Sequence, residues 1–150
     1  MPLAAATSRA VPDRVADRVV PPPATSRAAM VVCIDDEAPV REAMTVLLAS
    51  WGCEVMAVED ADQAIARVNG RVPDLVLIDL HLGDDRPDGF AEIGRLRTAW
   101  GPRLPAALVT ADRDAANLSR ARNLGLDVLL KPVKPAQLRA LIAQRAVSAE

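Results

Sequence analysis

Five residues suited to metal and phosphate chemistry stand at the ends of apolar segments in this chain. They are three aspartates, one threonine and one lysine: Asp35, Asp36, Asp79, Thr110 and Lys131. Two carboxylates about 4 Å apart repel each other by roughly 1 kcal/mol in water and about 4 kcal/mol at an effective dielectric constant of 20. A fold that gathers these acids must therefore bring positive charge to them. Lys131 supplies one cation, and Mg²⁺ fits the remaining oxygen ligands best.

A carboxylate can also act as a nucleophile and form an aspartyl phosphate. Asp79 is the acceptor we predict, because it stands centrally between the acid pair and Lys131. A metal, the lysine ammonium and the Thr110 hydroxyl would neutralise the phosphoryl oxygens. Such a weak acceptor needs an energy-rich donor, such as a phosphohistidine or an acyl phosphate. The single histidine of the chain, His81, follows the acceptor too closely to be that donor, so the phosphoryl group must come from elsewhere.

A regular fold has to position these residues, and from Met30 onward strand-like and helix-like segments alternate. Five short segments predict strands: 30–34, 54–58, 75–79, 106–110 and 128–131. Three of them are almost continuously apolar, which is typical of strands covered on both faces of a parallel sheet. The alternation predicts an α/β fold of the (βα)5 type, a doubly wound sheet with helices on both faces. Ligands bind outside the carboxyl ends of such strands, which is where the five residues stand.

The composition excludes several classes of protein. The chain has 150 residues, of which 51% are apolar, 25% charged and only 2% aromatic, and its net charge is −2. This balance argues against a nucleic-acid-binding surface, which needs concentrated positive charge. No apolar segment is long enough to cross a bilayer, and the first residues lack the features of a secretory signal. We therefore expect a cytoplasmic protein with neither a membrane nor a nucleic acid as its partner.

The first 29 residues differ from the rest of the chain. They hold five of the twelve prolines, so we expect residues 1–29 to be a disordered leader and residues 30–146 to form the globular domain. A short amphipathic turn through Val11, Val15 and Val19 is the alternative for the leader. Cys33 and Cys53 lie in apolar stretches without a CxxC pattern, so we expect two buried free thiols in a reducing compartment.

Four segments together carry a resemblance to a known family. The sequences VVCIDDE at 31–37, LID at 77–79, LVTA at 108–111 and LKP at 130–132 are similar to the receiver domain of two-component response regulators. Each motif is weak alone, but their order and spacing are specific, and the similarity covers about residues 30–145. It implies a flavodoxin-like fold with a five-stranded parallel sheet in the order 2-1-3-4-5.

The resemblance also implies a role for each acid. Asp79 corresponds to the phosphoacceptor. Asp36 and Asp79 correspond to direct ligands of Mg²⁺, the backbone carbonyl of His81 to a third ligand, and Asp35 to a residue that acts mostly through water.

Two further residues correspond to groups that respond to the phosphoryl group. Thr110 matches the hydroxyl that moves to bond it, and Lys131 matches the lysine of the site, with a cis peptide bond before Pro132. The implied protein is a receiver rather than a turnover enzyme. Its phosphoryl group would come from a sensor histidine kinase or a histidine phosphotransfer protein. It would signal through protein contacts, because no output domain follows in this sequence. The last segments also resemble the terminal receivers of hybrid histidine kinases.

The sequence departs from the family pattern at two places near the site. Val128 stands three residues before the lysine, where the family usually has Phe or Tyr. The loop 80–89 is about two residues longer than usual, with Gly83 where a proline is common. His81 and Asp112 stand at positions where, in the family, side chains tune the access of water to the phosphoryl group.

Two other functions remain to be weighed. A receiver-like scaffold that is never phosphorylated would keep this fold, although the acids and the lysine are all present. An aspartyl-phosphate phosphatase of the haloacid dehalogenase type needs a second aspartate two residues after the nucleophile. That position holds His81, which disfavours the phosphatase.

Overall fold

Residues 28–148 are described by a computed structural model, and most of the predicted leader lies outside them. Within this part of the chain five strands alternate with five helices. The strands are β1 (Met30–Ile34), β2 (Glu54–Val58), β3 (Leu75–Asp79), β4 (Ala106–Thr110) and β5 (Asp127–Leu130). The helices are α1 (Ala38–Ser50), α2 (Ala61–Val68), α3 (Gly89–Trp100), α4 (Ala115–Asn123) and α5 (Pro135–Ser148).

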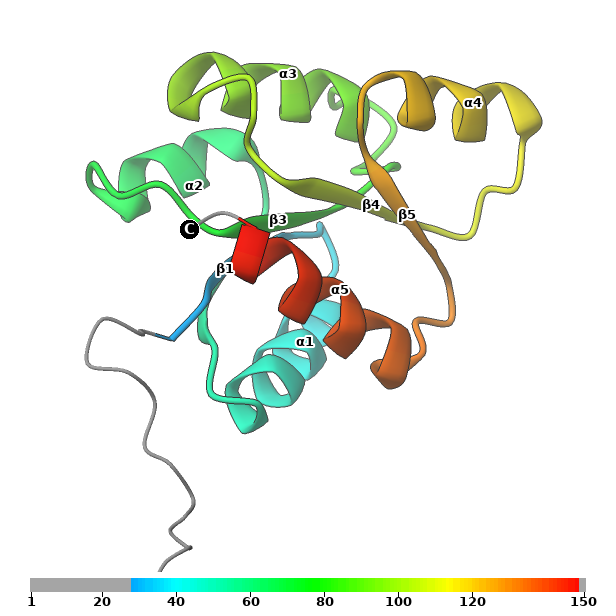
Figure 1. The fold of residues 1–150 in the computed structure, drawn as a ribbon. Helices are drawn as coiled ribbons and strands as arrows, with labels where there is room; N and C mark the ends of the chain where they lie inside the picture. The colour runs from blue at the N-terminus through cyan, green and yellow to red at the C-terminus, as the bar shows by residue number, and fades with distance from the viewer. Residues whose placement is uncertain (1–27, 149–150) are drawn as a thin grey trace, which may run out of the picture.

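The strands form one parallel sheet in the order β2-β1-β3-β4-β5, with α2, α3 and α4 on one face and α1 and α5 on the other (Figure 1). This confirms the predicted (βα)5 fold and strand order. The predicted fifth strand was one residue out of place, because Asp127 pairs with Ala107 at its start. Lys131 stands just beyond the strand, although its N–H still donates to the Thr110 carbonyl over 2.9 Å.

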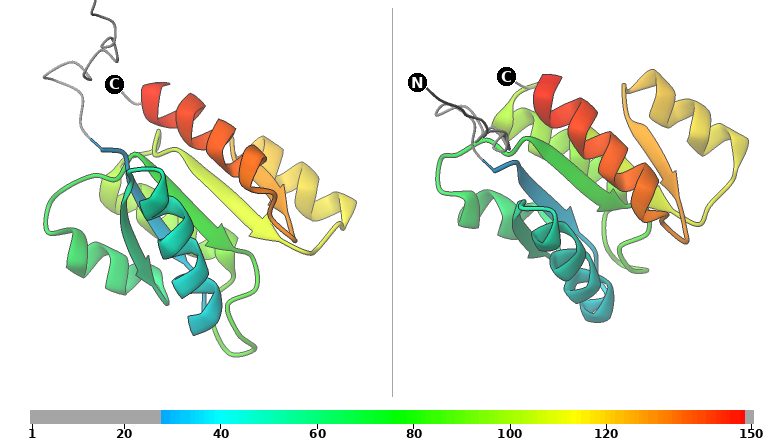
Figure 2. Two further views of the ribbon diagram at one scale, coloured as in Figure 1. Left: turned by 90° about the horizontal axis from the view of Figure 1, so that it is seen from below. Right: turned by 60° about the horizontal axis from the view of Figure 1, so that its bottom comes forward.

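Alternate residues of the three central strands fill two separate cores. Even-numbered positions such as Val32 and Ile78 pack toward α2 and α3, whereas odd-numbered positions such as Cys33 and Leu77 pack toward α1 and α5. Every residue of β1, β3 and β4 is buried, as their continuous apolar sequences predict. The two views of Figure 2 show α1 and α5 lying over the same face of the sheet. Both faces are therefore covered, and the open edge at the strands' carboxyl ends remains for function.

Three helices next to this edge begin with an aspartate that caps them. The carboxylates of Asp60, Asp88 and Asp114 accept hydrogen bonds from the N–H groups of the first turns of α2, α3 and α4. Such caps satisfy backbone donors that have no partner within the helix. Prolines at the starts of α1 and α5 lie where a missing N–H is tolerated, as predicted. The helix starts, and the loops before them, are thus held in place at the site.

The two cysteines are both free, but they differ in exposure. Cys33 is buried on β1, and burial raises the pKa of its thiol to about 12, with a further increase from the charge of Asp35. Cys53 is only half-buried, which corrects the prediction of two buried thiols, because it lies in the turn before β2. Across residues 28–148, no helix combines the length and apolarity needed to cross a membrane.

One glycine allows α3 to start directly against the end of β3. A Cβ atom at Gly89 would lie 2.6 Å from the Asp79 carbonyl oxygen and 3.0 Å from the Cα atom of Leu80. The Gly89 N–H also donates to the Leu80 carbonyl over 2.8 Å. Since both neighbours are backbone, a side chain at this position must displace the segment that carries Asp79.

We therefore expect Gly89→Ala to lower the free energy of unfolding by about 1–3 kcal/mol, the usual effect of overpacking. Gly94→Ala is the matched control on the same helix, because nothing lies within 4 Å of a Cβ atom there. It should raise the free energy of unfolding by about 0.5–1 kcal/mol, since alanine loses less backbone entropy in a helix. Urea unfolding of the two variants measures both effects. Equal free energies of unfolding for the two variants would show that the backbone shifts to accommodate a side chain at position 89.

Candidate functional site

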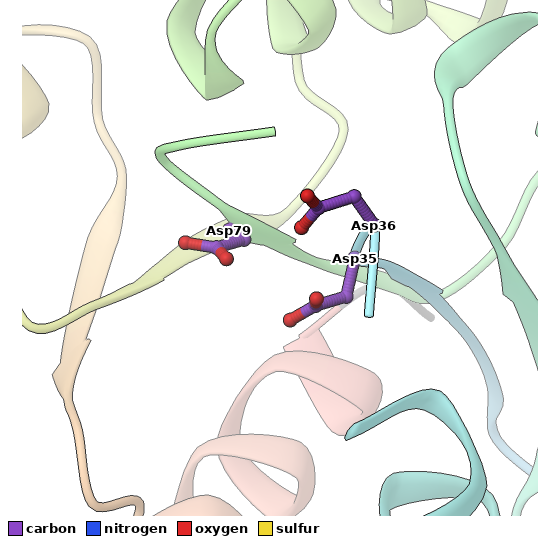
Figure 3. A group of neighbouring side chains, drawn as sticks. All are labelled: Asp35, Asp36 and Asp79. Atoms are coloured by element: carbon purple, nitrogen blue, oxygen red, sulfur yellow. The ribbon is translucent and has the colours of Figure 1, made fainter. Parts of the chain in front are cut away.

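Three aspartates come together at the carboxyl edge of the sheet. One carboxylate oxygen from each of Asp35, Asp36 and Asp79 lies within 4.8 Å of the others (Figure 3). Asp35 and Asp79 are buried, whereas Asp36 is exposed. Asp35 extends toward the side of the sheet where α1 and α5 lie, and Asp36 extends toward the opposite side. The convergence predicted from the ends of apolar strands is confirmed for these three residues.

Neighbouring strands bring these acids together. β1 and β3 pair in register at Ile34 and Ile78, so the residues that follow, Asp35 and Asp79, emerge side by side. The Asp35 carboxylate accepts a hydrogen bond from the Glu37 N–H over 2.9 Å, which bends the chain toward α1. The geometry of the acid pair therefore depends on the parallel pairing of two buried strands.

Lys131 provides the positive charge that the acids require. Its Nζ lies 3.2 Å from Asp79 Oδ2 and 3.9 Å from Asp35 Oδ2. The peptide bond between Lys131 and Pro132 is cis, as the resemblance implies. The ammonium thus contacts both buried carboxylates from the end of β5, two strands away from β3.

One lysine does not balance the charge of this cluster. Burial raises the pKa of Asp35 above its ordinary range, the hydrogen bond from Glu37 lowers it, and the charge of Asp79 raises it further. Because this pKa is higher in the folded chain, the stabilisation from Asp35 is present at low pH. It is lost as the pH rises through the folded-state value. Ionised Asp35 therefore opposes folding at neutral pH, and a second cation nearby would relieve that effect.

The donor set fits a hard divalent ion. Three carboxylates can each offer one oxygen, and the exposed side of Asp36 leaves room for bound water. Mg²⁺ is coordinated in this way, through one or two carboxylates and several waters. Of the expected ligands, Asp36 and Asp79 lie in this cluster, and the backbone of His81 adjoins it. The His81 N–H also donates to Asp79 Oδ1 over 3.3 Å.

Thr110 lies at the end of β4 and is 2% exposed. Its hydroxyl oxygen accepts a hydrogen bond from the Asp112 N–H over 3.0 Å. The Asp112 carboxylate in turn accepts from the Asn117 amide over 2.9 Å and lies 3.4 Å from Nε2 of His81. The hydrogen bond from the Asp114 N–H is the largest cause that holds the pKa of Asp112 below its ordinary range. His81 and Asp112, expected to lie near the acceptor, are therefore joined to each other and to α4.

Hydrogen bonds from an arginine that the sequence did not indicate hold the long loop after Asp79 in place. Arg86 donates to Asp60 Oδ2 over 3.0 Å and to the Glu59 carbonyl over 3.4 Å, which links the loop to the start of α2. Its Cδ atom lies 3.2 Å from the position of a Cβ atom on Gly83, and Asp36 Oδ2 lies 4.0 Å from the same position. Gly83 thus lies between the Arg86 side chain and the carboxylate of Asp36.

Arg41 and Asn117 were also missed. Nη1 of Arg41 donates to the Asp35 carbonyl over 2.8 Å, and Asn117 anchors Asp112 as described above. Both are single polar residues on helices, where helical spacing alone does not distinguish a site contact from an exposed side chain. Val128, in place of the usual aromatic residue, is partly buried and packs against the core beside α3 and α4.

Comparison with known proteins decides the family. Residues 31–143 match the model of the response regulator receiver domain. This chain belongs to that family. Receiver domains are signalling domains of two-component systems, generally not turnover enzymes, and they generally bind Mg²⁺ at an acidic pocket such as the one formed by the three aspartates.

Curated relatives of this receiver domain include a DNA-binding response regulator and a transcriptional regulatory protein. The chain is 31% identical over 116 residues to the DNA-binding response regulator MtrA of Mycolicibacterium paratuberculosis, covering 77% of this chain and 50% of that protein. It is 33% identical over 112 residues to the phosphate regulon transcriptional regulatory protein PhoB of Pseudomonas aeruginosa, covering 73% and 48%. The receiver chain thus spans about half the length of these relatives.

Solved structures agree with the fold. A response regulator receiver protein from Pseudomonas putida superimposes with a TM-score of 0.71 at 26% identity, covering 80% of this chain and 99% of that one. A CheY-like receiver domain protein from Methanospirillum hungatei gives a TM-score of 0.70 at 21% identity, covering 81% and 96%. At that lower identity the second likeness supports the fold alone.

The acid cluster predicts a stabilising effect of magnesium. At 100 times its dissociation constant, an ion that binds only the folded chain raises the free energy of unfolding by about 2.7 kcal/mol. We expect this gain in the wild-type receiver and its loss in Asp36→Ala. Asp84→Ala is the matched control, because Asp84 is an exposed acid in the neighbouring loop and outside the cluster. Denaturant unfolding with and without Mg²⁺ measures the effect. An equal gain in Asp36→Ala and the wild type would contradict the site.

Proposed function

We propose that this receiver domain accepts a phosphoryl group on Asp79 from a phosphohistidine of a sensor histidine kinase or a histidine phosphotransfer protein. The observation that carries the proposal is the position of Asp79. Its carboxylate adjoins Asp35 and Asp36 on one side and the Lys131 ammonium, 3.2 Å away, on the other. No other carboxylate of the three has a lysine this close, which favours Asp79 as the acceptor.

The residues around Asp79 have separate roles in the transfer of the phosphoryl group. An oxygen of the Asp79 carboxylate attacks phosphorus while the bond from phosphorus to the histidine nitrogen breaks. Lys131 orients Asp79 and then neutralises a phosphoryl oxygen, which is the main requirement of phosphoryl transfer. Asp36, Asp79 and the His81 carbonyl would hold Mg²⁺, with Asp35 acting through water, and the bound ion would supply further positive charge to the phosphoryl group.

Thr110 carries the response in this proposal. Its hydroxyl turns from the Asp112 N–H toward a phosphoryl oxygen, so the Asp112 N–H loses its acceptor. Asp112 is bonded to Asn117, so the change extends to α4. Because Val128 has no ring to move, we propose that signalling to protein partners uses this polar connection.

The remaining expectations belong to the same proposal. We place the folded receiver at residues 30–146, close to the 31–143 matched by the family model. A cytoplasmic location fits two free thiols, since reducing compartments keep cysteines unpaired.

The direct test is the intact mass of the protein after incubation with acetyl phosphate and Mg²⁺. We expect wild type to gain one phosphoryl group and Asp79→Asn to gain none. Asp88→Asn is the matched control, because Asp88 is an exposed helix cap in the next loop and should leave labelling intact. A phosphorylated Asp79→Asn would place the acceptor elsewhere. No labelling by acetyl phosphate or by a phosphorylated kinase would favour an unphosphorylated scaffold.

A further inference from the structure

An arginine in the loop between β3 and α3 connects that loop to the loop between β2 and α2. Nη2 of Arg86 donates to Asp60 Oδ2 over 3.0 Å and to the Glu59 carbonyl over 3.4 Å. Its Nη1 lies 3.9 Å from Oε1 of Glu59. Neither of these two acids belongs to the cluster of three aspartates. Arg86 thus joins the loop that follows Asp79 to a loop that carries none of the clustered acids.

The middle of the loop between β3 and α3 has few other attachments. Leu80 and Leu82 are buried at its start and Gly89 is buried at its end, but every residue in 83–88 except Arg86 is exposed. Within 83–88, a stretch that the structure describes in full, only Arg86 donates side-chain hydrogen bonds to another loop. The position of this stretch therefore depends largely on one guanidinium group.

The same stretch adjoins the acid cluster. Gly83 lies between the Arg86 side chain and the carboxylate of Asp36, and the Arg86 N–H donates to the Gly83 carbonyl over 3.3 Å. His81, whose N–H donates to Asp79, stands two residues before Gly83. A displacement of this turn would therefore extend to the surroundings of Asp36 and to the backbone of His81, which are two of the expected metal ligands.

A second arginine connects the loop between β2 and α2 to the first acids of the cluster. Nη1 of Arg41 donates to the Asp35 carbonyl over 2.8 Å, and its Nη2 lies 4.0 Å from Oε2 of Glu59. Glu59 thus lies between Arg41 and Arg86. The two segments that carry the clustered acids are both connected to one loop, and its carboxylates oppose the positive charge of Arg86.

We propose that Arg86 is a positioning residue of the metal site. It holds the loop between β3 and α3 in the arrangement that allows Asp36 and the His81 carbonyl to bind Mg²⁺. This inference rests on the proposed function, because the ion concerned is the one that would serve the transfer to Asp79. A loop that is already in place does not have to be ordered when the ion binds, so the apparent affinity for the ion is higher.

The first expected result is a weaker binding of Mg²⁺ by Arg86→Ala. We expect the dissociation constant to rise about tenfold, or about 1.4 kcal/mol, the lower end of what a hydrogen bond between charged groups contributes, because the pair is partly exposed. Calorimetric titration with Mg²⁺ measures the constant. Arg71→Ala is the matched control, because Arg71 makes a bidentate pair with Glu54 at the opposite end of β2. It should keep the wild-type constant.

A second variant tests whether Arg86 acts through Asp60. Asp60 Oδ1 caps α2 by accepting from the Gln63 N–H over 2.8 Å, whereas Oδ2 accepts from Arg86. Asparagine retains an oxygen for the cap, but its amide nitrogen cannot accept a hydrogen bond from Arg86. Asp60→Asn should therefore weaken Mg²⁺ binding roughly threefold. The double variant Arg86→Ala/Asp60→Asn should bind Mg²⁺ no more weakly than Arg86→Ala, since the two changes remove one interaction.

Phosphorylation rates distinguish a positioning residue from a catalytic one. The rate with acetyl phosphate is followed by intact mass over a range of Mg²⁺ concentrations. Arg86→Ala should need about tenfold more Mg²⁺ for half of its maximal rate. Its maximal rate should stay within about twofold of the wild-type rate, because Arg86 contacts the neighbouring loop and not the acceptor. A residue that stabilised the phosphoryl group directly would lower the maximal rate instead.

The outcomes separate this inference from the proposed function. An unchanged Mg²⁺ dissociation constant in Arg86→Ala would overturn the inference, and so would a double variant that binds Mg²⁺ more weakly than Arg86→Ala. A lower maximal rate at saturating Mg²⁺ would also overturn it. If Asp79 is phosphorylated in the wild type while Arg86→Ala binds Mg²⁺ normally, the inference fails and the proposed function stands. If Arg86→Ala binds Mg²⁺ weakly but no donor phosphorylates the wild type, the proposed function fails and the positioning of the metal site stands.

Discussion

Repulsion between buried carboxylates is the constraint on which the rest of this structure depends. Asp35 and Asp79 lie together at the edge of the sheet, away from solvent, and burial raises the pKa of Asp35. The ammonium group of Lys131 offsets this repulsion. Lys131 follows β5, two strands away from β3, and lies close to both acids. A single ammonium leaves the cluster with net negative charge. That remaining charge is the reason why we propose this edge as the site for a divalent ion and for the transfer of a phosphoryl group.

The fold and the positions of the five residues suited to metal and phosphate chemistry were predictable, because both depend on local sequence patterns. A parallel strand buried on both faces needs a continuous apolar run, and the polar residue that ends the run marks the carboxyl edge. Asp79 and Thr110 were found in this way. The fifth strand was misplaced by one residue because Asp127, at its start, is polar. It is held by Arg145 of α5, a contact between distant parts of the chain.

The contacts around the site could not be predicted in the same way. Arg86 and Asn117 make their hydrogen bonds because of how their side chains are directed and how the loop runs. Both features depend on segments that are distant in the sequence. The need for glycine at position 89 likewise comes from the backbone of β3 and not from its own helix. Val128 shows the opposite case. The sequence reveals that the usual aromatic side chain is missing, but only the structure shows the polar connection from Thr110 to α4.

The central claim is that Asp79, of the three clustered acids, carries the phosphoryl group. Its most direct test is to treat the phosphorylated protein with borohydride, which reduces an aspartyl phosphate to homoserine, and then to locate the change by peptide mass spectrometry. The account predicts homoserine at position 79, with positions 35 and 36 unchanged. Homoserine at either of those positions, with Asp79 intact, would contradict it.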